Sequence, residues 1–249
     1  LTLYESTGVQ TTNEQEWMDA VKRLRELPLV DSEHFIDETL RAGHDVLAEG
    51  AQGTLLDIDF GTYPFVTSSN TISAGACTGL GVAPSRIGRV IGIFKAYCTR
   101  VGSGPFPTEL DNDLGENIRQ AGGEFGSTTG RPRRCGWLDI PALRYAVMIN
   151  GITELAMTKA DVLSGMAEVS LCTHYKVNGR MTDRMPYDIC TDIEPIFESM
   201  VGWKDRSSID GRLSAFIERV EQAVGVPITM VSMGPGREQM VLRETAAVH

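Results

Sequence analysis

Residues 89–97 read Arg89-Val-Ile-Gly-Ile-Phe-Lys-Ala-Tyr97, a nearly continuous apolar run. Such a run predicts a strand in a sheet covered on both faces, because polar residues would alternate with apolar ones if one face met water. Residues 154–157 (Glu-Leu-Ala-Met) and 228–231 (Ile-Thr-Met-Val) predict two further strands. Helical patterns lie between these strands, over 139–150 and 213–224. The alternation predicts an α/β fold with a largely parallel central sheet flanked by helices.

The remaining elements are read from local signals in the same way. A capping box, Thr12-x-x-Gln15, predicts a helix that ends before Pro28 and buries one apolar face. Asn178-Gly179 is a strong hairpin signal between strands at 169–177 and 180–184. Residues 183–203 have no clear period and are expected to be irregular. The other expected elements are helices over 32–42 and 114–120, a short strand over 46–48 and an edge strand over 240–242.

Composition limits the classes of protein to be considered. The 249 residues hold 23 Lys and Arg against 33 Asp and Glu, a net charge of −10, which argues against a general nucleic-acid binder. No apolar run approaches the ~18 residues of a membrane span. Five widely spaced cysteines without a CxxC pair argue against a disulfide framework and a zinc site, and they favour a reducing cytoplasm. The four histidines also lack metal-ligand spacing.

Three glycine-rich stretches follow or connect the expected strands. The turn 49–53 comes directly after the strand expected at 46–48, and the loop 100–108 follows the strand at 89–97. Residues 57–81 are rich in Gly, Ser, Thr and Asn, which is compatible with a flexible linker. They also contain the cluster Tyr63-Pro-Phe-Val66, which linkers seldom carry, so an ordered ligand-lining loop with a short helix at 74–78 is favoured. In open α/β sheets, ligands bind at loops of this kind.

The most basic stretch of this acidic chain is Gly126-Ser-Thr-Thr-Gly-Arg-Pro-Arg-Arg134. Guanidinium groups grip carboxylates and phosphates through paired hydrogen bonds, and glycines let the backbone approach a ligand. The stretch therefore indicates an anion-binding loop, which we call the arginine loop. The alternative is an ordinary solvated basic turn.

A four-residue motif, Thr158-Lys-Ala-Asp161, follows the strand at 154–157. It is similar to the guanine-reading motif of GTP-binding proteins. A carboxylate accepts hydrogen bonds from both guanine N1–H and the exocyclic amine, whereas adenine offers no such pair of donors. Alone the motif is a weak signal, because a Lys and an Asp on a loop are usually only solvated.

Taken in order, the loops at 49–57, 61–71, 99–110, 126–137 and 158–161 resemble those of the adenylosuccinate synthetase family. The resemblance implies a P-loop-NTPase-like α/β fold with a β-hairpin excursion. It also implies a homodimer that makes adenylosuccinate from IMP, L-aspartate and GTP. In that reaction GTP phosphorylates the 6-oxygen of IMP, and the aspartate amine then displaces the phosphate, with Mg²⁺ as the metal cofactor.

The resemblance assigns binding roles residue by residue. The residues matched to the IMP site are Gln52, Thr67, Val101 and Arg131. The residues matched to the aspartate site are Ser127, Thr128, Thr129, Gly130, Arg131 and Arg133. The residues matched to the GTP site are Arg133, Lys159, Ala160, Asp161, Ser232, Met233 and Gly234. Three other basic residues, Lys95, Arg100 and Arg134, are expected to be structural or to set the local field.

The sequence departs from the family pattern in one respect. No glycine-rich phosphate loop with a lysine precedes Gly50, and His34 and His44 lack the context of the family's catalytic histidine. With Leu1 as first residue, the chain is expected to be a single α/β domain over 1–249, the C-terminal part of a longer synthetase. The catalytic base, the acid and the Mg²⁺ ligands would lie upstream, so the chain alone is expected to be inactive.

Three other classes of function were weighed against this interpretation. A regulatory or nucleotide-binding module without catalysis would keep the binding loops, which makes it the main alternative. A signalling GTPase is disfavoured because the chain has no GxxxxGK[ST] loop. A purely structural or interaction domain would not account for five loops that match one family in order.

Overall fold

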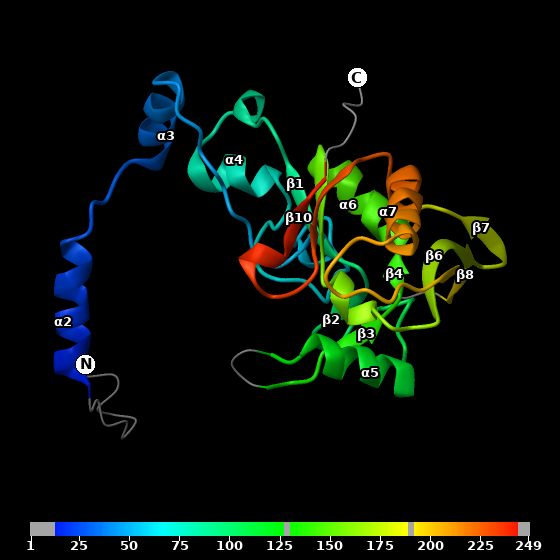
Figure 1. Ribbon diagram of the computed structural model, residues 1–249. Helices are drawn as coiled ribbons and strands as arrows, with labels where there is room; N and C mark the ends of the chain where they lie inside the picture. The colour runs from blue at the N-terminus through cyan, green and yellow to red at the C-terminus, as the bar shows by residue number, and fades with distance from the viewer. Residues whose placement is uncertain (1–12, 127–129, 189–191, 244–249) are drawn as a thin grey trace. The chain divides into compact units, whose positions relative to one another are not determined.

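The computed structural model of the chain describes residues 13–126, 130–188 and 192–243 (Figure 1). Its contacts divide the chain into two compact units. The first is Leu1–Leu47 with Leu80–Val82, and the second is Ala48–Gly79 with Ala83–His249. The single domain expected over 1–249 stays a prediction.

The first unit contains two helices, α2 (Glu14–Arg25) and α3 (Ser32–Arg41), as the sequence predicts. Helix α3 ends just before Gly43, which has a φ of +84° that favours glycine at this position. The residue that caps α2 is Asn13, and its side chain makes no capping hydrogen bond. The expected capping residue, Thr12, lies outside the described residues.

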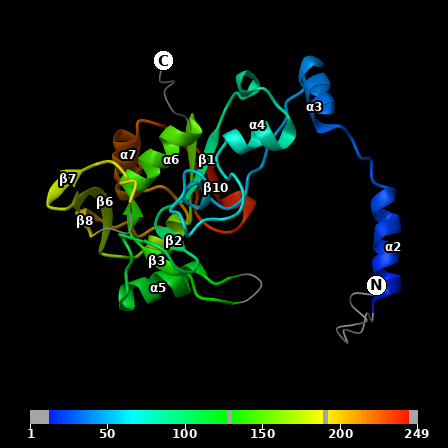
Figure 2. The same cartoon turned by 180° about the vertical axis from the view of Figure 1, so that it is seen from behind.

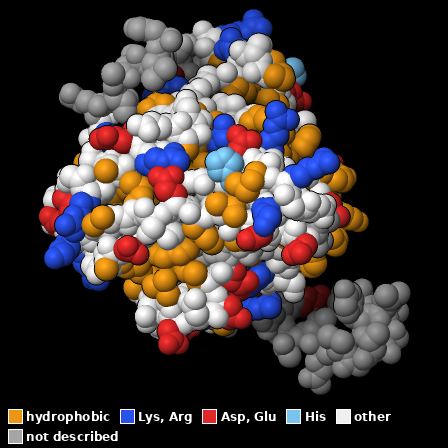
Figure 3. Space-filling model, turned by 90° about the vertical axis from the view of Figure 1, so that its right-hand side faces the viewer, with side chains coloured by type: hydrophobic (Ala, Val, Ile, Leu, Met, Phe, Trp, Pro, Cys, Tyr) orange, Lys and Arg blue, Asp and Glu red, His pale blue; other side chains and the backbone are white. Residues whose placement is uncertain are grey.

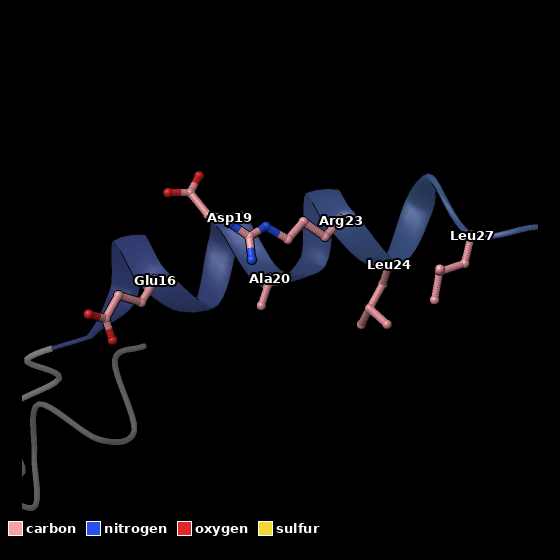
Figure 4. A pocket seen from close by; sticks show the side chains of 6 residues that line it. All are labelled: Glu16, Asp19, Ala20, Arg23, Leu24 and Leu27. Atoms are coloured by element: carbon pink, nitrogen blue, oxygen red, sulfur yellow. The ribbon is translucent and has the colours of Figure 1, made fainter.

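The expected buried face of α2 is the first correction. None of its residues is buried, and Trp17 is 65% exposed. A shallow hollow along the helix is lined only by α2 and the residues just after it, with both apolar and charged side chains (Figure 4). These side chains are Glu16, Asp19, Ala20, Arg23, Leu24 and Leu27. Helical periodicity therefore predicted the helix correctly, but it does not specify what packs against the apolar stripe.

The strand expected over 46–48 is the second correction, because these residues form neither helix nor strand. Val46 is 41% exposed and Leu47 is 87% exposed. Three apolar residues are too few to specify a strand, since a strand is stabilised only by pairing with a neighbour.

The second unit is built on a four-stranded sheet in the order β1-β5-β9-β10. Strands β1 (Ile91–Lys95), β5 (Glu154–Thr158) and β9 (Ile228–Ser232) are parallel to one another. Strand β10 (Met240–Leu242) pairs with β9 in the antiparallel sense at the edge of the sheet. All four strands were predicted from the sequence, and they give the parallel centre that the α/β class requires.

One face of this sheet packs into the main core of the unit. Leu155, Met157 and Val231 are fully buried together with apolar side chains of α6 (Ile140–Asn150) and α7 (Gly211–Val224). Both helices end at a glycine in the left-handed region, as predicted at residues 151 and 225.

The expectation of a sheet covered on both faces is wrong at the edge strand β1, because the second face of this strand is exposed. Ile91 is 39% exposed and Ile93 is 76% exposed in the structure. Both side chains lie on the same face, because successive residues of a strand alternate between faces. The apolar run makes β1 suited to burial on both faces, but none of the described residues forms a layer that covers this second face.

A second sheet contains the predicted hairpin. Strands β6 (Glu168–Val177) and β7 (Arg180–Thr182) turn at Asn178 and Gly179, which have φ values of +49° and +79°. The short strand β4 (Leu138–Asp139) pairs with β6 in parallel.

Strand β8 (Ile193–Val201) pairs antiparallel with nearly the whole of β6, so the expectation that residues 183–203 are irregular is wrong over this range. Pro195 obscured the pattern, because proline lacks the N–H that a central strand needs. It is accommodated here because β8 has a paired strand on one side only.

The remaining elements connect these sheets. Figures 1 and 2 both show α5 (Asp113–Gly122) beside the antiparallel pair of β2 (Cys98–Arg100) and β3 (Arg134–Gly136). The short helix expected near 74–78 is α4 (Ala74–Leu80). Four 3₁₀ helices complete the description, η1 (Thr54–Leu56), η2 (Pro84–Arg86), η3 (Ala160–Leu163) and η4 (Arg237–Gln239). The predicted α/β class is confirmed, with parallel strands flanked by helices in a mixed set of sheets.

Two observations concern the exterior. Figure 3 views the side on which α7 and β6 to β8 lie, and acidic and basic side chains alternate across it with apolar patches between them. Within the described ranges, no helix has the length and apolar character required to cross a bilayer.

Asp139 is a buried carboxyl at the start of α6, where it accepts hydrogen bonds from Ala142 N at 3.1 Å and from the Tyr175 hydroxyl at 2.6 Å. Burial raises its pKa to about 6, and the hydrogen bonds offset only part of that effect. The folded state therefore holds this proton more tightly than the unfolded chain does. Stability due to this group is greatest below pH 3.8 and is lost as the pH rises through 6.

We expect Asp139→Asn to remove this pH dependence, because asparagine retains an acceptor for Tyr175 and cannot ionise. Urea unfolding measured from pH 4.5 to 7.5 should show the wild-type chain losing about 2 kcal/mol relative to the variant across that window. Parallel curves for the two chains would contradict the assignment. Asp139→Ala serves as the control that removes the helix cap as well.

Candidate functional site

The sequence-predicted nucleotide loops lie at the same edge of the parallel sheet. Strand β5 ends at Thr158 and leads directly into Lys159 and η3, and β9 ends at Ser232. Because β5 and β9 are parallel neighbours, their carboxyl ends lie together, and η3 also contacts β9. The structure thus brings 159–161 and 232–234 into one place, where open α/β sheets bind ligands.

Lys159 adopts a left-handed backbone conformation with a φ of +59°. This conformation is uncommon for residues with a side chain and is enriched at functional sites. The Lys159 ammonium donates to the Gly122 carbonyl of α5, which fixes its direction. The conformation turns the chain sharply at the end of β5 and starts η3.

Asp161 is half-buried in η3, and its hydrogen bonding differs from that of most buried acids of this chain. Among the described residues, none donates a hydrogen bond to its carboxylate. Buried polar groups are normally paired, so a carboxylate with open acceptors indicates a ligand position. The fully buried Ala160 beside it is held by Trp203, whose indole N–H donates to the Ala160 carbonyl at 3.0 Å.

The 232–234 turn is fixed by its own hydrogen bonds. The Ser232 hydroxyl donates to the Gly234 carbonyl at 2.7 Å, and Met233 N donates to the Gln239 carbonyl at 2.9 Å. A Cβ at Gly234 would lie 2.4 Å from the side-chain amide of Gln239, so the Gln239 side chain packs directly over this glycine. Ser232 and Met233 are buried, so this turn is a firm wall rather than a mobile loop.

The arginine loop is closed at its base like a hairpin. Phe125 and Pro132 form an isolated β-bridge, and Arg133 N donates to the Glu124 carbonyl at 2.9 Å. Gly130 has a φ of +64°, and its N–H donates to the Gly126 carbonyl at 2.8 Å. Three of the residues expected to bind aspartate, Ser127, Thr128 and Thr129, lie outside the described residues. Arg131 is exposed.

Glu124, two residues before the arginine loop, is fully buried and accepts hydrogen bonds from two separate segments. Its carboxylate accepts from Lys95 at 2.8 and 2.9 Å, from the Tyr97 hydroxyl at 2.7 Å and from Arg133 at 2.8 Å. The Lys159 ammonium lies 3.3 Å from the same carboxylate. Burial alone would raise the pKa of Glu124, but these donors outweigh it and lower the pKa to about 2.

The sequence analysis did not single out Glu124. The available signal was an acidic side chain two residues before a Gly-rich loop that contains three arginines. Lys95 was correctly expected to be structural or field-setting, because its ammonium is committed to Glu124. It also donates to the Thr99 hydroxyl at 2.9 Å.

Two other arginines hold loops together, in agreement with the structural role expected for them. Arg134 pairs with Glu109 and donates to the Gly104 carbonyl at 2.7 Å. Arg100 donates to the Thr62 hydroxyl and to the Phe65 carbonyl, both at 3.1 Å. Both guanidinium groups tie the loop after β2 to its neighbours.

Three of the four residues expected at the IMP site, all but Arg131, lie on or beside one long loop. Gln52 has a φ of +68°, and its side-chain amide donates to the Thr67 hydroxyl at 3.1 Å. Val101 is 57% exposed and directly follows Arg100, which is bonded to the same loop as Thr67. The structure therefore joins Gln52 to Thr67 and places Val101 beside a residue that contacts their loop.

The Asp57 carboxylate orders this loop from within. It is fully buried and accepts from the backbone N–H groups of Asp59, Phe60, Thr71 and Ile72 at 2.6 to 3.2 Å. Burial would raise its pKa, but the four backbone donors lower it below the ordinary value. The alternative of a flexible linker over 57–81 is therefore wrong, and the segment is an ordered loop.

Metal-ligand groups were searched for in the same region. Within 13–126, 130–188 and 192–243, no group of three or more His, Cys, Asp and Glu side chains could hold a metal ion. The described residues therefore do not fit a Mg²⁺ site of their own. The four described cysteines, Cys77, Cys98, Cys135 and Cys172, are all free thiols.

The fold and the loops define the class to which the chain belongs. A parallel β1-β5-β9 sheet carries, at its carboxyl edge, a turn with a strained lysine, an open carboxylate and an adjacent basic loop. These are features of α/β proteins that bind anionic ligands and nucleotides at that edge.

The comparisons with known proteins then give the family. The adenylosuccinate synthetase family model matches residues 2–241, so the chain belongs to the adenylosuccinate synthetase family. It is 57% identical over 233 residues to the adenylosuccinate synthetase of Cytophaga hutchinsonii, covering 90% of this chain and 54% of that relative. It is 54% identical over 242 residues to that of Parabacteroides distasonis, covering 94% of this chain and 57% of the relative.

A solved structure agrees with these relatives. The fully ligated adenylosuccinate synthetase of Plasmodium falciparum superposes with a TM-score of 0.89 at 39% identity, covering 98% of this chain and 60% of that one. The chain thus spans little more than half the length of the relatives that it matches.

Proposed function

We propose that this chain carries the IMP-, aspartate- and guanine-binding loops of an adenylosuccinate synthetase, a GTP-dependent ligase of AMP biosynthesis. In this reaction the 6-oxygen of IMP takes the γ-phosphoryl group of GTP, and the amine of L-aspartate then displaces that phosphate to form adenylosuccinate. Family membership supports the reaction, and the observation that carries the proposal is the meeting of 159–161 with 232–234 at one sheet edge.

The guanine base is assigned to that edge. The two open acceptors of the Asp161 carboxylate suit guanine N1–H and the exocyclic amine, which lie side by side on one edge of the base. The Lys159 stem would lie against the base, and the buried 232–234 turn would close the pocket. The proposed GTP contacts are Arg133, Lys159, Ala160, Asp161, Ser232, Met233 and Gly234.

The two carboxylates of L-aspartate are assigned to the arginine loop. A dicarboxylate needs at least two cationic donors, and arginine supplies them in a planar fork. The proposed aspartate contacts are Ser127, Thr128, Thr129, Gly130, Arg131 and Arg133. The proposed IMP contacts are Gln52, Thr67, Val101 and Arg131, of which the bonded pair Gln52 and Thr67 provides an amide and a hydroxyl in one place.

Mg²⁺ is part of the proposal for the family reaction, but no step is assigned to it here, because the described residues offer no ligand set. A homodimer and a cytoplasmic location are proposed on the same basis of family membership. We further propose that the 249-residue chain binds nucleotide without turnover, since its described residues offer no ligand set for the Mg²⁺ that the family's phosphoryl transfer uses. A non-catalytic nucleotide-binding module is the second candidate, favoured by the same observation.

A thermal-shift series with GDP, ADP, IMP and IMP plus GDP tests the guanine pocket. A ligand at 100 times its Kd stabilises the folded state by about 2.7 kcal/mol, which corresponds to a rise in Tm of about 5 to 10 °C. We expect GDP to raise the Tm and ADP to leave it unchanged. Equal shifts with GDP and ADP would reject the assignment of Asp161, and no shift with any nucleotide would reject binding by this chain.

Turnover separates the two candidate functions. We expect no adenylosuccinate from the 249-residue chain with IMP, GTP, L-aspartate and Mg²⁺. An extended chain that includes a glycine-rich phosphate loop should form the product if the chain is part of a synthetase. A bound but inactive extended chain would favour the non-catalytic module.

A further inference from the structure

The Glu124 carboxylate is the one group described that contacts both the arginine loop and the loop at 159–161. Its Oε1 atom accepts from Tyr97 at 2.7 Å and from Lys95 at 2.8 Å, and lies 3.3 Å from Lys159. Its Oε2 atom accepts from Arg133 at 2.8 Å and from Lys95 at 2.9 Å. Five contacts therefore share a carboxylate that offers about four lone-pair positions.

The contact with Lys159 is the weakest of the five. The other four distances lie between 2.7 and 2.9 Å, typical of charge-assisted hydrogen bonds, whereas 3.3 Å is longer than such a bond. Lys159 is therefore held loosely by Glu124 while Arg133 is held firmly. Since the donors compete for one negative charge, weakening one contact strengthens the others.

The charge of the cluster is also unbalanced. One buried carboxylate faces three cations, Lys95, Arg133 and Lys159, which leaves two positive charges without a partner inside the cluster. The Nε atom of Arg133 is buried and has no hydrogen-bond partner among the described residues. The guanidinium therefore has a donor left to offer to an arriving anion.

The backbone at Arg133 stays fixed if its side chain turns. Arg133 N donates to the Glu124 carbonyl at 2.9 Å, and Arg119 Nε donates to the Arg133 carbonyl at 2.7 Å. Only the guanidinium needs to change partners when a carboxylate ligand binds. That exchange would free part of the Glu124 charge for Lys159 without moving the base of the loop.

We propose that Glu124 is a positioning residue that couples the two ligand loops, so that L-aspartate at the arginine loop tightens the binding of guanine nucleotide at 159–161. The proposal rests on the proposed function for the identity of the two ligands. Aspartate draws Arg133 away from Glu124, and Glu124 then holds Lys159 more firmly against the nucleotide. By linkage, the nucleotide must tighten aspartate binding by the same factor.

Calorimetric titration of the 249-residue chain with GDP, with and without saturating L-aspartate, measures this coupling. We expect aspartate to lower the Kd of GDP about fivefold or more in the wild-type chain. Glu124→Gln should bring this ratio close to one, because a neutral amide cannot redistribute a charge. The matched control is Glu109→Gln. Glu109 is the carboxylate partner of Arg134, which lies in the same loop as Arg133, so this variant makes the same chemical change at a neighbouring ion pair and should keep the ratio.

Tyr97→Phe keeps the test decisive if Glu124→Gln does not fold. It removes one donor from Oε1 without changing any charge, which leaves more of that oxygen for Lys159. The Kd of GDP without aspartate should then approach the wild-type value with aspartate, so the ratio should fall. An unchanged ratio in both Glu124→Gln and Tyr97→Phe would overturn the proposal, as would a ratio of one in a wild-type chain that binds both ligands.

Amide hydrogen exchange without ligand separates this inference from the proposed function. Glu124→Gln, or Tyr97→Phe in its place, should change exchange rates in both 130–134 and 158–163, whereas Glu109→Gln should change only the region of 102–109 and 134. This result would support the shared anchor even if the wild-type chain bound no GDP. A change confined to 130–134 would overturn the coupling, whatever the nucleotide results.

Discussion

The Asp161→Asn chain is expected to bind GDP about a hundredfold more weakly than the wild type and to bind xanthosine diphosphate in its place. In the proposed complex the carboxylate would accept two hydrogen bonds from guanine, and each such bond to a charged group contributes about 1.5 to 3 kcal/mol. Asparagine keeps one acceptor and adds an amide donor. Xanthine offers an N1–H donor beside a carbonyl acceptor, which matches asparagine and opposes aspartate.

Competition between the two diphosphates, measured by calorimetry, decides this prediction. Asp183→Asn is the matched control. Asp183 directly follows β7 and pairs with Arg144 of α6, so the variant makes the same chemical change away from the nucleotide loops. It should leave GDP affinity unchanged. An Asp161→Asn chain that retained GDP affinity, or lost it without gaining xanthosine diphosphate, would place the base elsewhere.

The second large effect is expected for Trp203→Ala, which should lower the free energy of unfolding of its unit by about 4 kcal/mol. Trp203 is fully buried and lies against Phe216 with ring centroids 5.1 Å apart. Its removal leaves a cavity in the core and takes the N–H donor from the Ala160 carbonyl. The loop that carries Asp161 should therefore be weakened together with the core.

Urea unfolding of three variants separates these contributions. Trp203→Phe retains most of the packing but loses the indole N–H, so we expect a smaller loss of about 1 to 2 kcal/mol with a similar weakening of GDP binding. Trp17→Ala, at a side chain that is 65% exposed, should change the free energy of unfolding by less than about 0.5 kcal/mol. Equal losses at the two tryptophans would contradict the burial on which the prediction depends.

Elements with a strong local signal could be predicted from the sequence. The sequence of helix α6 contains a capping Asp139, a proline in the first turn at Pro141 and a terminal Gly151, and all three lie where expected. The hairpin at Asn178 and Gly179 is equally explicit. These signals act over a few residues, so the rest of the fold does not need to be known.

Features that depend on partners could not be predicted in the same way. The run at 46–48 is apolar but has no neighbouring strand, whereas β8 contains Pro195 and is stabilised by its long pairing with β6. The exposed face of β1 could not be predicted for the same reason. The apolar run Ile91 to Phe94 does not specify which layers pack against the strand. In these cases the pairing and packing of neighbouring segments override local propensity.

The candidate site shows the same division. The loops around Arg131 and Lys159 were identified from motifs and that at Ser232 from the family resemblance, and the structure brings 159–161 and 232–234 to one sheet edge. Glu124 escaped notice because a single glutamate carries no motif, and its importance comes from donors that are distant in sequence. Lys95 precedes it by 29 residues and Lys159 follows it by 35, so only the folded chain shows them sharing one carboxylate.

The pairing of the parallel strands has a consequence for the order of events during folding. Ile91 pairs with Glu154 and Leu155 with Ile228, so the partners are 63 and 73 residues apart in the chain. The turn between β6 and β7 joins Val177 to Arg180 across two residues and closes at little entropic cost. The hairpin is thus free to form early, while the strand ends that carry Lys159 and Ser232 are assembled only when segments 63 to 73 residues apart pair.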